Sequence, residues 1–308
     1  MRQNSAEKQK MDVIGFGALN LDRLYMVERI AREGEHVPVK GVCESPGGSA
    51  ANTITGLARL GLSTGFVGAL GRDQEGKILL EDFRKNNVDT SGISLLSGRT
   101  GIIIGFVDRK GERTLYPCPG VNSMLSEKDI DEGYAANASF MHITSFVSDK
   151  QFILQKRIVK KLPDVRISFS PGDLYVKKGA RRLSPLIKRS SVVFLNEAEA
   201  EELTGKDFRE GASRLLDRGA GIAAVTLGAR GCFVSGPEGS YDIPAYKVNV
   251  VDTTGAGDAF AAGFLYTLIK GCSLLEAGRN GNMVASLCIR KVGARTGLPY
   301  RSSLKKFI

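Results

Sequence analysis

Cysteine and histidine are scarce in this sequence, and neither is arranged for metal binding. The 308 residues include five cysteines and two histidines. The cysteines are odd in number and never form a C-x-x-C pair, so the pattern indicates neither a zinc site nor a disulfide framework and favours a reducing compartment. His36 and His142 stand alone, without metal-ligand spacing or a serine elbow nearby, and we interpret both as structural or incidental.

Long apolar segments are also lacking. No run of about 18 uncharged apolar residues occurs anywhere. The first ten residues, MRQNSAEKQK, lack the apolar core of a signal peptide. We therefore expect a cytoplasmic protein without a membrane partner.

Acidic residues are outnumbered by basic ones. The sequence has 43 Lys and Arg against 33 Asp and Glu, a net charge of +10. This excess favours an anionic partner such as a nucleotide or a sugar phosphate. It does not indicate nucleic acid, because the basic residues are spread along the chain and the cluster at 156–161 is typical of a solvated helix face. Glycine is abundant, with 37 residues, which suits loops that approach a nucleotide closely.

Apolar runs alternate with helical patterns along most of the chain. The runs are continuous, which predicts strands that are buried on both faces of a sheet. Such alternation is typical of an α/β fold, a parallel sheet with helices outside it and a ligand crevice at the carboxyl ends of the strands. The predicted strands are 12–18, 139–144, 165–170, 191–195 and 221–227, and the predicted helices are 49–61, 74–87, 149–162 and 208–219.

Two stretches, at about 23–45 and 98–118, break this rhythm. Both read as alternating strands, and the second contains a hairpin signal at 108–111. Because both return to the parent sheet, we expect one domain over residues 1–308 with a small β-sheet lid near the strand tips. The apolar segment 102–107 would be exposed on that lid, which predicts a homodimer that pairs lid against lid.

Two glycine-rich segments imitate nucleotide-binding motifs. Residues 71–77 fit G-x-x-x-x-G-K, but no Ser or Thr follows to bind a metal, and Asp73 is better interpreted as a helix cap. Residues 15–20 begin like a dinucleotide fingerprint, but Asn20 stands where the third glycine is needed for close helix packing. The pattern therefore disfavours a dinucleotide-dependent oxidoreductase.

The segment 251–265, VDTTGAGDAFAAGFL, carries the strongest chemical signal. A glycine turn with an aspartate cap is the simpler interpretation, but here a polar run, two glycines and a small-residue helix occur together. Amides of Ala256, Gly257 and Asp258 at a helix start would form an anion hole, because unpaired N–H groups and the positive end of the helix dipole meet there. The Asp258 carboxylate would lie beside a phosphoryl group and could accept a proton from an attacking hydroxyl.

A second glycine turn, SPGGSAAN at 45–52, also leads into a helix. Gly47 and Gly48 would let a polyol approach the backbone, although a plain loop with a helix cap is the other interpretation. Asn52, together with Asn20 and Asp22 at the tip of the first strand, offers donors and acceptors to adjacent hydroxyls. This density of polar side chains predicts a polyhydroxylated ligand.

Together, GGSAANTITGLARLG and DTTGAGDAFAAGF resemble the two signature motifs of the ribokinase-like (PfkB) family of carbohydrate and nucleoside kinases. The resemblance covers almost the whole chain and implies a three-layer αβα sandwich with a mostly parallel central sheet and a β-sheet lid. The further matching patterns are G-x-x-N-x-D at 17–22, V-G-x-x-G-x-D at 67–73, N-x-x-E at 196–199, T-x-G-x-x-G at 226–231 and Gly293-Ala294.

The resemblance also implies the roles of individual residues on the acceptor side. It implies that Asp258 is the base and that Gly255, Ala256 and Gly257 form the anion hole. The residues implied to hold the sugar are Asn20, Asp22, Gly47, Gly48 and Asn52.

On the nucleotide side, the resemblance implies a site for ATP and Mg²⁺. Asn196 and Glu199 match the pair that organises the phosphates and hydrated magnesium. Asp252 and Thr254 match positions that bind a monovalent cation such as K⁺, and without an ion they would simply brace the turn. The residues implied to line the nucleotide cleft are Thr226, Gly228 and Gly231, with Asn282 as a neighbour of the adenine or ribose or as a plain helix-surface amide.

We therefore predict an ATP- and Mg²⁺-dependent enzyme that phosphorylates a hydroxymethyl group of a small sugar. A nucleoside kinase with the same chemistry and a non-catalytic sugar- or nucleotide-binding relative are the alternatives, and the retained Asp258 disfavours the second. Arg113 stands where ribokinases proper have few large cations, and it could bind a carboxylate or phosphate once the lid closes, although an ordinary exposed arginine of the lid is the other interpretation. Asp22 would repel such a group, so we expect a neutral acceptor.

Overall fold

A central sheet of ten strands organises the molecule. The computed structural model describes residues 10–304. The strand order is β14-β13-β12-β11-β10-β9-β1-β4-β5, with β6 also paired to β4, and only the pairs that involve β13 are antiparallel. The strands are β1 (Met11–Phe16), β4 (Thr64–Gly71), β5 (Val88–Asp89), β6 (Ile93–Leu96), β9 (Ala138–Thr144), β10 (Arg166–Ser170), β11 (Ser190–Asn196), β12 (Ala223–Thr226), β13 (Cys232–Gly236) and β14 (Gly239–Ile243).

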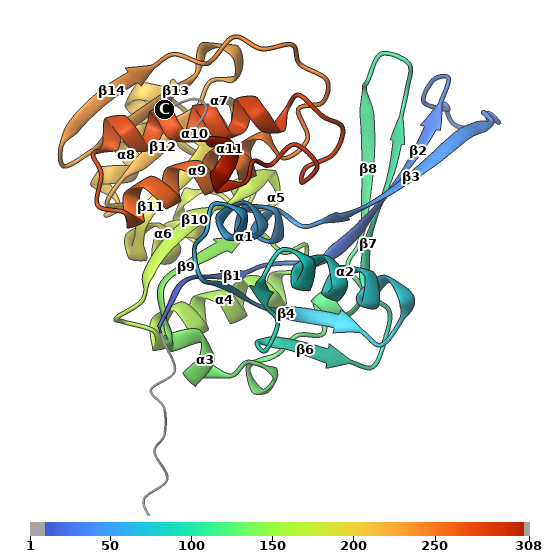
Figure 1. Cartoon of the computed structure of the whole chain (residues 1–308), viewed down its shortest axis with the longest axis horizontal. Helices are drawn as coiled ribbons and strands as arrows, with labels where there is room; N and C mark the ends of the chain where they lie inside the picture. Colours follow the sequence, from blue (N-terminus) through green and yellow to red (C-terminus); the bar gives the residue numbers. More distant parts are fainter. Residues whose placement is uncertain (1–9, 305–308) are drawn as a thin grey trace, which may run out of the picture.

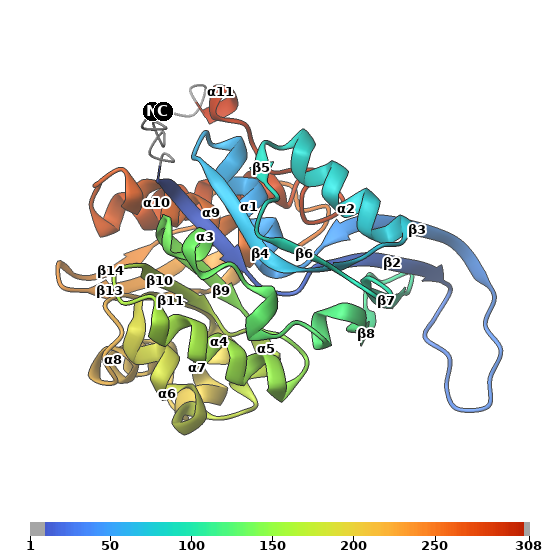
Figure 2. The same cartoon turned by 90° about the horizontal axis from the view of Figure 1, so that it is seen from below.

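Helices cover both faces of this sheet, so the domain has three layers (Figure 2). One buried apolar cluster joins the sheet to α1 (Ser49–Arg59), α2 (Gln74–Lys85), α9 (Ala256–Ile269) and α10 (Leu274–Cys288). A second cluster joins the opposite face to α3 (Glu132–Ala136), α4 (Asp149–Lys161), α5 (Gly172–Val176), α6 (Ala180–Arg189), α7 (Glu197–Thr204) and α8 (Phe208–Asp217). Every residue of β4 is buried, as expected for a strand covered by helices on both faces.

A separate four-stranded sheet extends from one side of the sandwich (Figure 1). Its order is β3-β2-β7-β8, built from β2 (Asn20–Val27), β3 (Val39–Gly47), β7 (Gly101–Val107) and β8 (Arg113–Cys118). The β2–β7 pair is parallel and the other two pairs are antiparallel. We call these four strands the lid sheet.

The sequence predicted the mostly parallel sheet with outer helices and the small lid sheet, and the structure confirms both. All four predicted helices are present, within two residues at each end. Asp73 caps α2 by accepting from the Gly76 amide at 2.9 Å, which confirms the capping interpretation of the false phosphate loop. Gly15 is needed for packing, because a Cβ there would lie 2.6 Å from Ile54. Within residues 10–304, no helix is long and apolar enough to cross a membrane.

The antiparallel end of the main sheet was not predicted. β13 and β14 form a hairpin beyond β12. β13 is buried except at its last residue, but β14 is mostly exposed and lacks the continuous apolar run that marked the other strands. α10 packs against this hairpin, and α11 (Arg301–Leu304) follows it in the chain.

Candidate active site

The first turn of α9 offers unoccupied backbone donors. Gly255 precedes the helix at φ 76°, a left-handed conformation that favours glycine, and a Cβ there would lie 2.6 Å from that of Ala294. No side chain caps the helix. The Ala256 amide donates to the Thr253 carbonyl at 3.1 Å, whereas the amides of Gly257 and Asp258 meet no acceptor among the described residues. Of the four amides predicted to form the anion hole, those of Gly255, Gly257 and Asp258 therefore have no acceptor among the described residues, and that of Ala256 has one.

Two side chains of α1 hold the carboxylate of Asp258. Ser49 donates to Oδ1 at 2.6 Å and Asn52 donates to Oδ2 at 2.8 Å. Thr53 donates to the Asp258 carbonyl at 3.3 Å. Burial raises the pKa of Asp258 above the usual range of an aspartate, and the hydrogen bonds from Ser49 and Asn52 oppose that rise. The result is a fixed carboxylate with increased basicity beside the free amides.

A cavity of about 150 Å³ connects Asp258 to the start of α7. Asn196 and Glu199 lie there and cap each other's backbone: Asn196 accepts from the Glu199 amide at 2.8 Å, and Glu199 accepts from the Asn196 amide at 2.9 Å. Burial raises the pKa of Glu199, and the nearby charges of Asp173 and Asp258 raise it further.

This end of the site fits a magnesium ion held jointly with phosphates. Within residues 10–304, no group of three Asp, Glu, His or Cys side chains could hold a metal alone. Mg²⁺ usually keeps several waters and takes only one or two carboxylates together with substrate phosphates. Glu199 and Asn196 present side-chain oxygens of that kind in the cavity. Burial is the main cause of the raised pKa of Glu199, and the negative charges of Asp173 and Asp258 add to it.

An adjoining cleft of about 530 Å³, mostly apolar, has the size and lining expected for a nucleoside. It shares Thr226, Gly257 and Phe260 with the cavity around Asp258. Gly228, Gly231 and Asn282 also line it, with Ala245, Tyr246, Val250 and Ala285 among the apolar neighbours. All four residues predicted for the nucleotide cleft, Thr226, Gly228, Gly231 and Asn282, thus line the same cleft.

Two of these residues shape the cleft through the backbone. A Cβ on Gly231, at φ 98°, would lie 2.0 Å from the carbonyl oxygen of Ile243, so only glycine fits. Asn282 is buried and donates to the carbonyls of Ile243 and Pro244, both at 3.1 Å. Its amide hydrogens therefore brace the cleft wall, and it is not the helix-surface amide of the alternative interpretation.

The predicted acceptor residues meet where the lid sheet leaves the core. Asn20 on β2 lies opposite Gly47 on β3, and the Asp22 carboxylate packs on the Cα of Gly47, where a Cβ would come within 2.3 Å. Burial raises the pKa of Asp22 to about 6, and the charge of Arg295 opposes this rise. Asn52 is only 5% exposed, so it supports Asp258 from behind and has little surface left for a sugar.

Arg113 connects the lid sheet to the loop before α9. Its Nη1 donates to Thr254 Oγ1 at 2.5 Å. Its charge opposes the burial that raises the pKa of Asp22, and it adds to the hydrogen bonds from Thr254 and Gly293 that lower the pKa of Asp252. The Asp252 carboxylate accepts from the amide and hydroxyl of Thr254, at 2.8 and 2.6 Å, and from the Gly293 amide at 2.8 Å. These contacts brace the turn before α9, as expected for Asp252 and Thr254 without an ion, and the K⁺ site stays a prediction.

A family model for pfkB family carbohydrate kinases matches residues 10–301. The chain belongs to this family. A protein of Archaeoglobus fulgidus, an uncharacterized sugar kinase, is 41% identical over 247 residues, 79% of this chain and 98% of that protein. The ATP-dependent ribose-1-phosphate kinase of Halopiger xanaduensis is 32% identical over 285 residues, 92% of this chain and 94% of that protein. The ribokinase of Arabidopsis thaliana, solved with ribose and ATP, has a TM-score of 0.84 at 26% identity and covers 96% of this chain and 98% of its own.

As a pfkB family carbohydrate kinase, the chain has two site residues that sequence reasoning missed. Arg295 follows the matched Gly293-Ala294 pair, and only its burial, at 6% exposure, distinguishes it from the many surface cations. Asn122 was also missed: it holds the start of β2 by accepting from the Leu19 amide at 3.0 Å and donating to Asn20 Oδ1 at 3.0 Å. His142 is fully buried, accepts or donates at Ser168 Oγ at 2.9 Å and has its pKa lowered by burial to about 3, which fits the structural interpretation.

Proposed function

We propose that this carbohydrate kinase transfers the γ-phosphoryl group of ATP to a hydroxymethyl group of a small sugar, with Asp258 as the general base. One observation carries the proposal: the Asp258 carboxylate, fixed by Ser49 and Asn52, lies beside the free amides at the start of α9 and in the cavity that joins the nucleotide cleft. A base and an anion hole in one turn suit phosphoryl transfer, where positioning and charge stabilisation do most of the work.

The reaction then follows from these positions. Asp258 accepts the proton of the acceptor hydroxyl as its oxygen attacks the γ-phosphorus. A new P–O bond forms, the bond between the γ-phosphorus and the β–γ bridging oxygen breaks, and ADP leaves. The amides of Gly257 and Asp258 donate to the oxygens of the transferred group. When Mg²⁺ is bound, held with water by Glu199 and Asn196, it supplies positive charge that neutralises the phosphates.

The acceptor side offers polar groups that suit the hydroxyls of a small neutral sugar. A cavity of about 70 Å³ lies next to Asn20, lined by Asn122, Ser145 and Phe146 among others. The side-chain amide of Asn122 and the hydroxyls of Ser145 and Ser148 give it hydrogen-bond partners for sugar hydroxyls. Asp22 supplies a carboxylate that binds adjacent hydroxyls well and repels anions.

An acidic or phosphorylated sugar is the second candidate, and Arg113 is the observation that favours it. Its guanidinium reaches from β8 to Thr254, beside the acceptor residues. One relative, 32% identical, is an ATP-dependent ribose-1-phosphate kinase. An arginine fork of this kind binds phosphate or carboxylate in two-point fashion.

We also propose that two chains pair through the outer face of the lid sheet, and that the enzyme works in the cytoplasm. Asp22 and Arg113 share the face toward the active site, so the alternating residues Tyr25, Phe106 and Tyr116 lie on the other face, as ring neighbours. Tyr116 is 55% exposed and Val42 54% exposed. A second copy would cover this apolar surface. All five cysteines are free, in keeping with a reducing compartment.

A donor-and-acceptor panel tests the function. ATP is offered with pentoses, hexoses, a sugar acid, sugar phosphates and nucleosides, ADP release is followed, and the product is examined by phosphorus NMR. We expect a phosphomonoester of a primary alcohol from a neutral sugar. Preferential turnover of a nucleoside, or of the acid or phosphorylated sugars, would replace the acceptor class, and phosphorylation of a secondary hydroxyl would contradict the proposed reaction.

A further inference from the structure

A buried arginine, Arg295, contacts Asn52, the residue that donates to the Asp258 carboxylate. Arg295 is in the loop after α10, and its side chain is 6% exposed. A buried charge costs free energy unless it is paired and hydrogen-bonded. The contacts of Arg295 therefore show what the charge does there.

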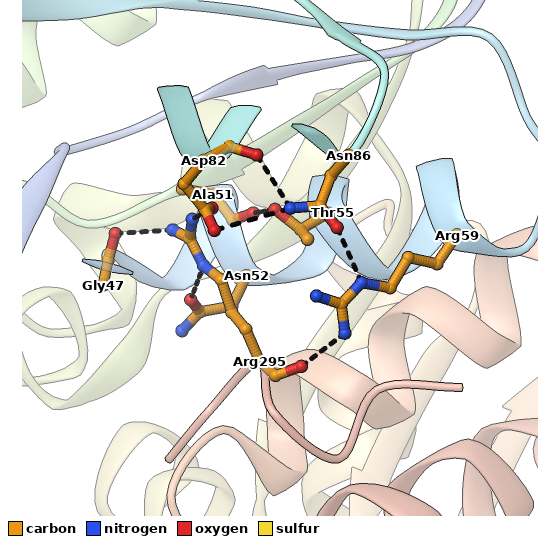
Figure 3. Close-up of polar contacts among 8 residues, drawn as sticks. All are labelled: Gly47, Ala51, Asn52, Thr55, Arg59, Asp82, Asn86 and Arg295. Atoms are coloured by element: carbon orange, nitrogen blue, oxygen red, sulfur yellow. Dashed lines mark hydrogen bonds and ion pairs between the residues drawn. The ribbon is translucent and has the colours of Figure 1, made fainter. Parts of the chain in front are cut away.

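The guanidinium of Arg295 joins three segments that are distant in sequence (Figure 3). Nε donates to Oδ1 of Asn52 at 2.8 Å, and Nη2 donates to the Gly47 carbonyl at 2.8 Å. Nη1 forms an ion pair with Asp82 of α2. All three nitrogens of the fork are used, which a lysine could not reproduce.

The contact with Asn52 decides which end of its amide faces the base. An amide has an acceptor oxygen at one end and a donor NH₂ at the other, and their exchange would place the oxygen against a carboxylate. Because Arg295 donates to Oδ1, the NH₂ group of Asn52 points to Asp258, where it donates to Oδ2 at 2.8 Å. We propose that Arg295 is a positioning residue that fixes the Asp258 carboxylate through the side chain of Asn52.

This inference rests on the proposed role of Asp258, and the charge of Arg295 supports it. Burial raises the pKa of Asp258, while Arg295 lowers it, and a base must be ionised to accept a proton. Arg295 also opposes the raised pKa of Asp22. The other titratable groups that interact with Asp258 are Asp22, Glu199 and Cys288.

Arg59 and Asn86 hold the backbone at Arg295 and Asp82, and Arg59 therefore offers a matched control variant. Arg59 of α1 donates to the carbonyls of Arg295 and Leu298, at 2.5 and 3.1 Å, and to Oδ1 of Asn86 at 2.7 Å. Asn86 in turn donates to the Asp82 carbonyl at 2.7 Å. Arg59 is bonded to the backbone of the same loop (Figure 3), but among the described residues no hydrogen bond joins it to Asn52 or Asp258, so its loss weakens the loop without turning the amide.

The experiment compares Arg295→Gln, Arg295→Lys and Arg59→Gln in steady-state kinetics over a pH series. For Arg295→Gln we expect kcat to fall about 10- to 100-fold, since small misplacements of reacting groups have costs of this order. The acid limb of the kcat profile moves to higher pH, because the charge that lowers the Asp258 pKa is gone, and the KM for ATP is unchanged. For Arg295→Lys we expect the acid limb of the kcat profile to stay at the wild-type pH while kcat falls. For Arg59→Gln we expect a change in thermal stability, with kcat and the acid limb as in the wild type.

Coupling with Asn52 makes the test specific. If Arg295 acts through Asn52, the double variant with Asn52→Ala and Arg295→Gln is no slower than Asn52→Ala alone. The inference would be overturned if the losses of kcat in the two single variants multiplied in the double variant. It would also be overturned if the acid limb of the kcat profile of Arg295→Gln stayed at the wild-type pH. Should Arg295→Gln fail to fold, wild-type kcat in Arg295→Lys would overturn it equally. A slow Asp258→Asn with a normal Arg295→Gln refutes only this inference, whereas an active Asp258→Asn refutes the proposed function itself.

Discussion

The two ends of the active site are held by different kinds of structure. At the transfer end, Asp258 lies on a core helix and is fixed by α1, which packs closely on α9: a Cβ on Gly56 would lie 2.8 Å from that of Ala262. At the acceptor end, Arg113 lies on an exposed strand and reaches the core through a bond to Thr254. Arg23 adds a second link between the lid sheet and the core, an ion pair to Glu75 of α2 at 3.4 Å.

Because of this difference, we expect the core to carry out the chemical step and the lid sheet to select the acceptor. Packing in the core fixes a charged group to within fractions of an ångström, which suits a base. A sheet joined to the core by a few polar contacts can move and exclude water when a substrate binds. We therefore expect substitutions at the transfer end to lower kcat for every acceptor, and substitutions at the lid to change which acceptors react.

The largest effect is expected from Asp258→Asn. The change removes the base and preserves the shape, so kcat should fall about 10²- to 10⁴-fold, the usual contribution of a general base. The KM for ATP should change little, because the nucleotide cleft is untouched. Ser49→Ala, which removes one of the two bonds to the carboxylate, is the milder partner and should lose less. More than a tenth of the wild-type kcat in Asp258→Asn would make Asp258 a structural residue.

Asp22→Asn and Arg113→Ala test the acceptor end. With neutral sugars, Asp22→Asn should lower kcat/KM about tenfold or more, because a hydrogen bond to a charged group contributes roughly 1.5–3 kcal/mol. Arg113→Ala should matter little for these acceptors. Both are measured with a pentose, a hexose, a nucleoside and a sugar acid. If Asp22→Asn has no effect while Arg113→Ala abolishes activity on an acidic or phosphorylated sugar, Arg113 is the specificity residue and the neutral acceptor is wrong.

The raised pKa of Asp22 predicts a pH-dependent stability. Its folded pKa is about 6 against 3.8 for the ordinary carboxyl, so the folded state holds the proton more tightly than the unfolded chain. Stability is therefore lost as the pH rises from about 4 to 6, and Asp22→Asn should relieve that loss. We expect the variant to be more stable at pH 7.5 by about 1–3 kcal/mol, from roughly 1.4 kcal/mol per unit and partial solvent screening. Urea unfolding of both proteins at pH 7.5 and pH 4 measures the difference in the free energy of unfolding. An equal increase in stability at both pH values would show that the titration of Asp22 is not the cause.

The smallest effect on catalysis is expected on the outer face of the lid sheet. Val42→Glu places a charge on the surface proposed to pair with a second copy, so light scattering should show a dimer for the wild type and a monomer for the variant. The kcat should stay near the wild-type value, since Val42 is remote from Asp258 in the fold. If the wild-type protein is monomeric at micromolar concentration, the proposal of a lid-to-lid dimer is wrong.

Local sequence was sufficient for four of the helices, for the continuous apolar strands of the main sheet and for the parts of the site that the backbone forms. The continuous apolar run at 139–144 predicted β9, which is buried throughout except at one position. The glycine turn before 258 predicted the helix start, because only glycine adopts the conformation of Gly255 easily beside Ala294. These features depend on residues adjacent in sequence, and elementary periodicity and backbone sterics reveal them.

The orientation of side chains across the fold was decided by tertiary structure alone. Nothing local distinguishes Arg295 from other basic residues, and its partners Asn52 and Asp82 are more than two hundred positions away. The same holds for Asn52, which the sequence assigned to the sugar and the fold turned toward Asp258. A buried charge finds its partners only when packing removes water and brings distant segments together, so its role is a property of the assembled core.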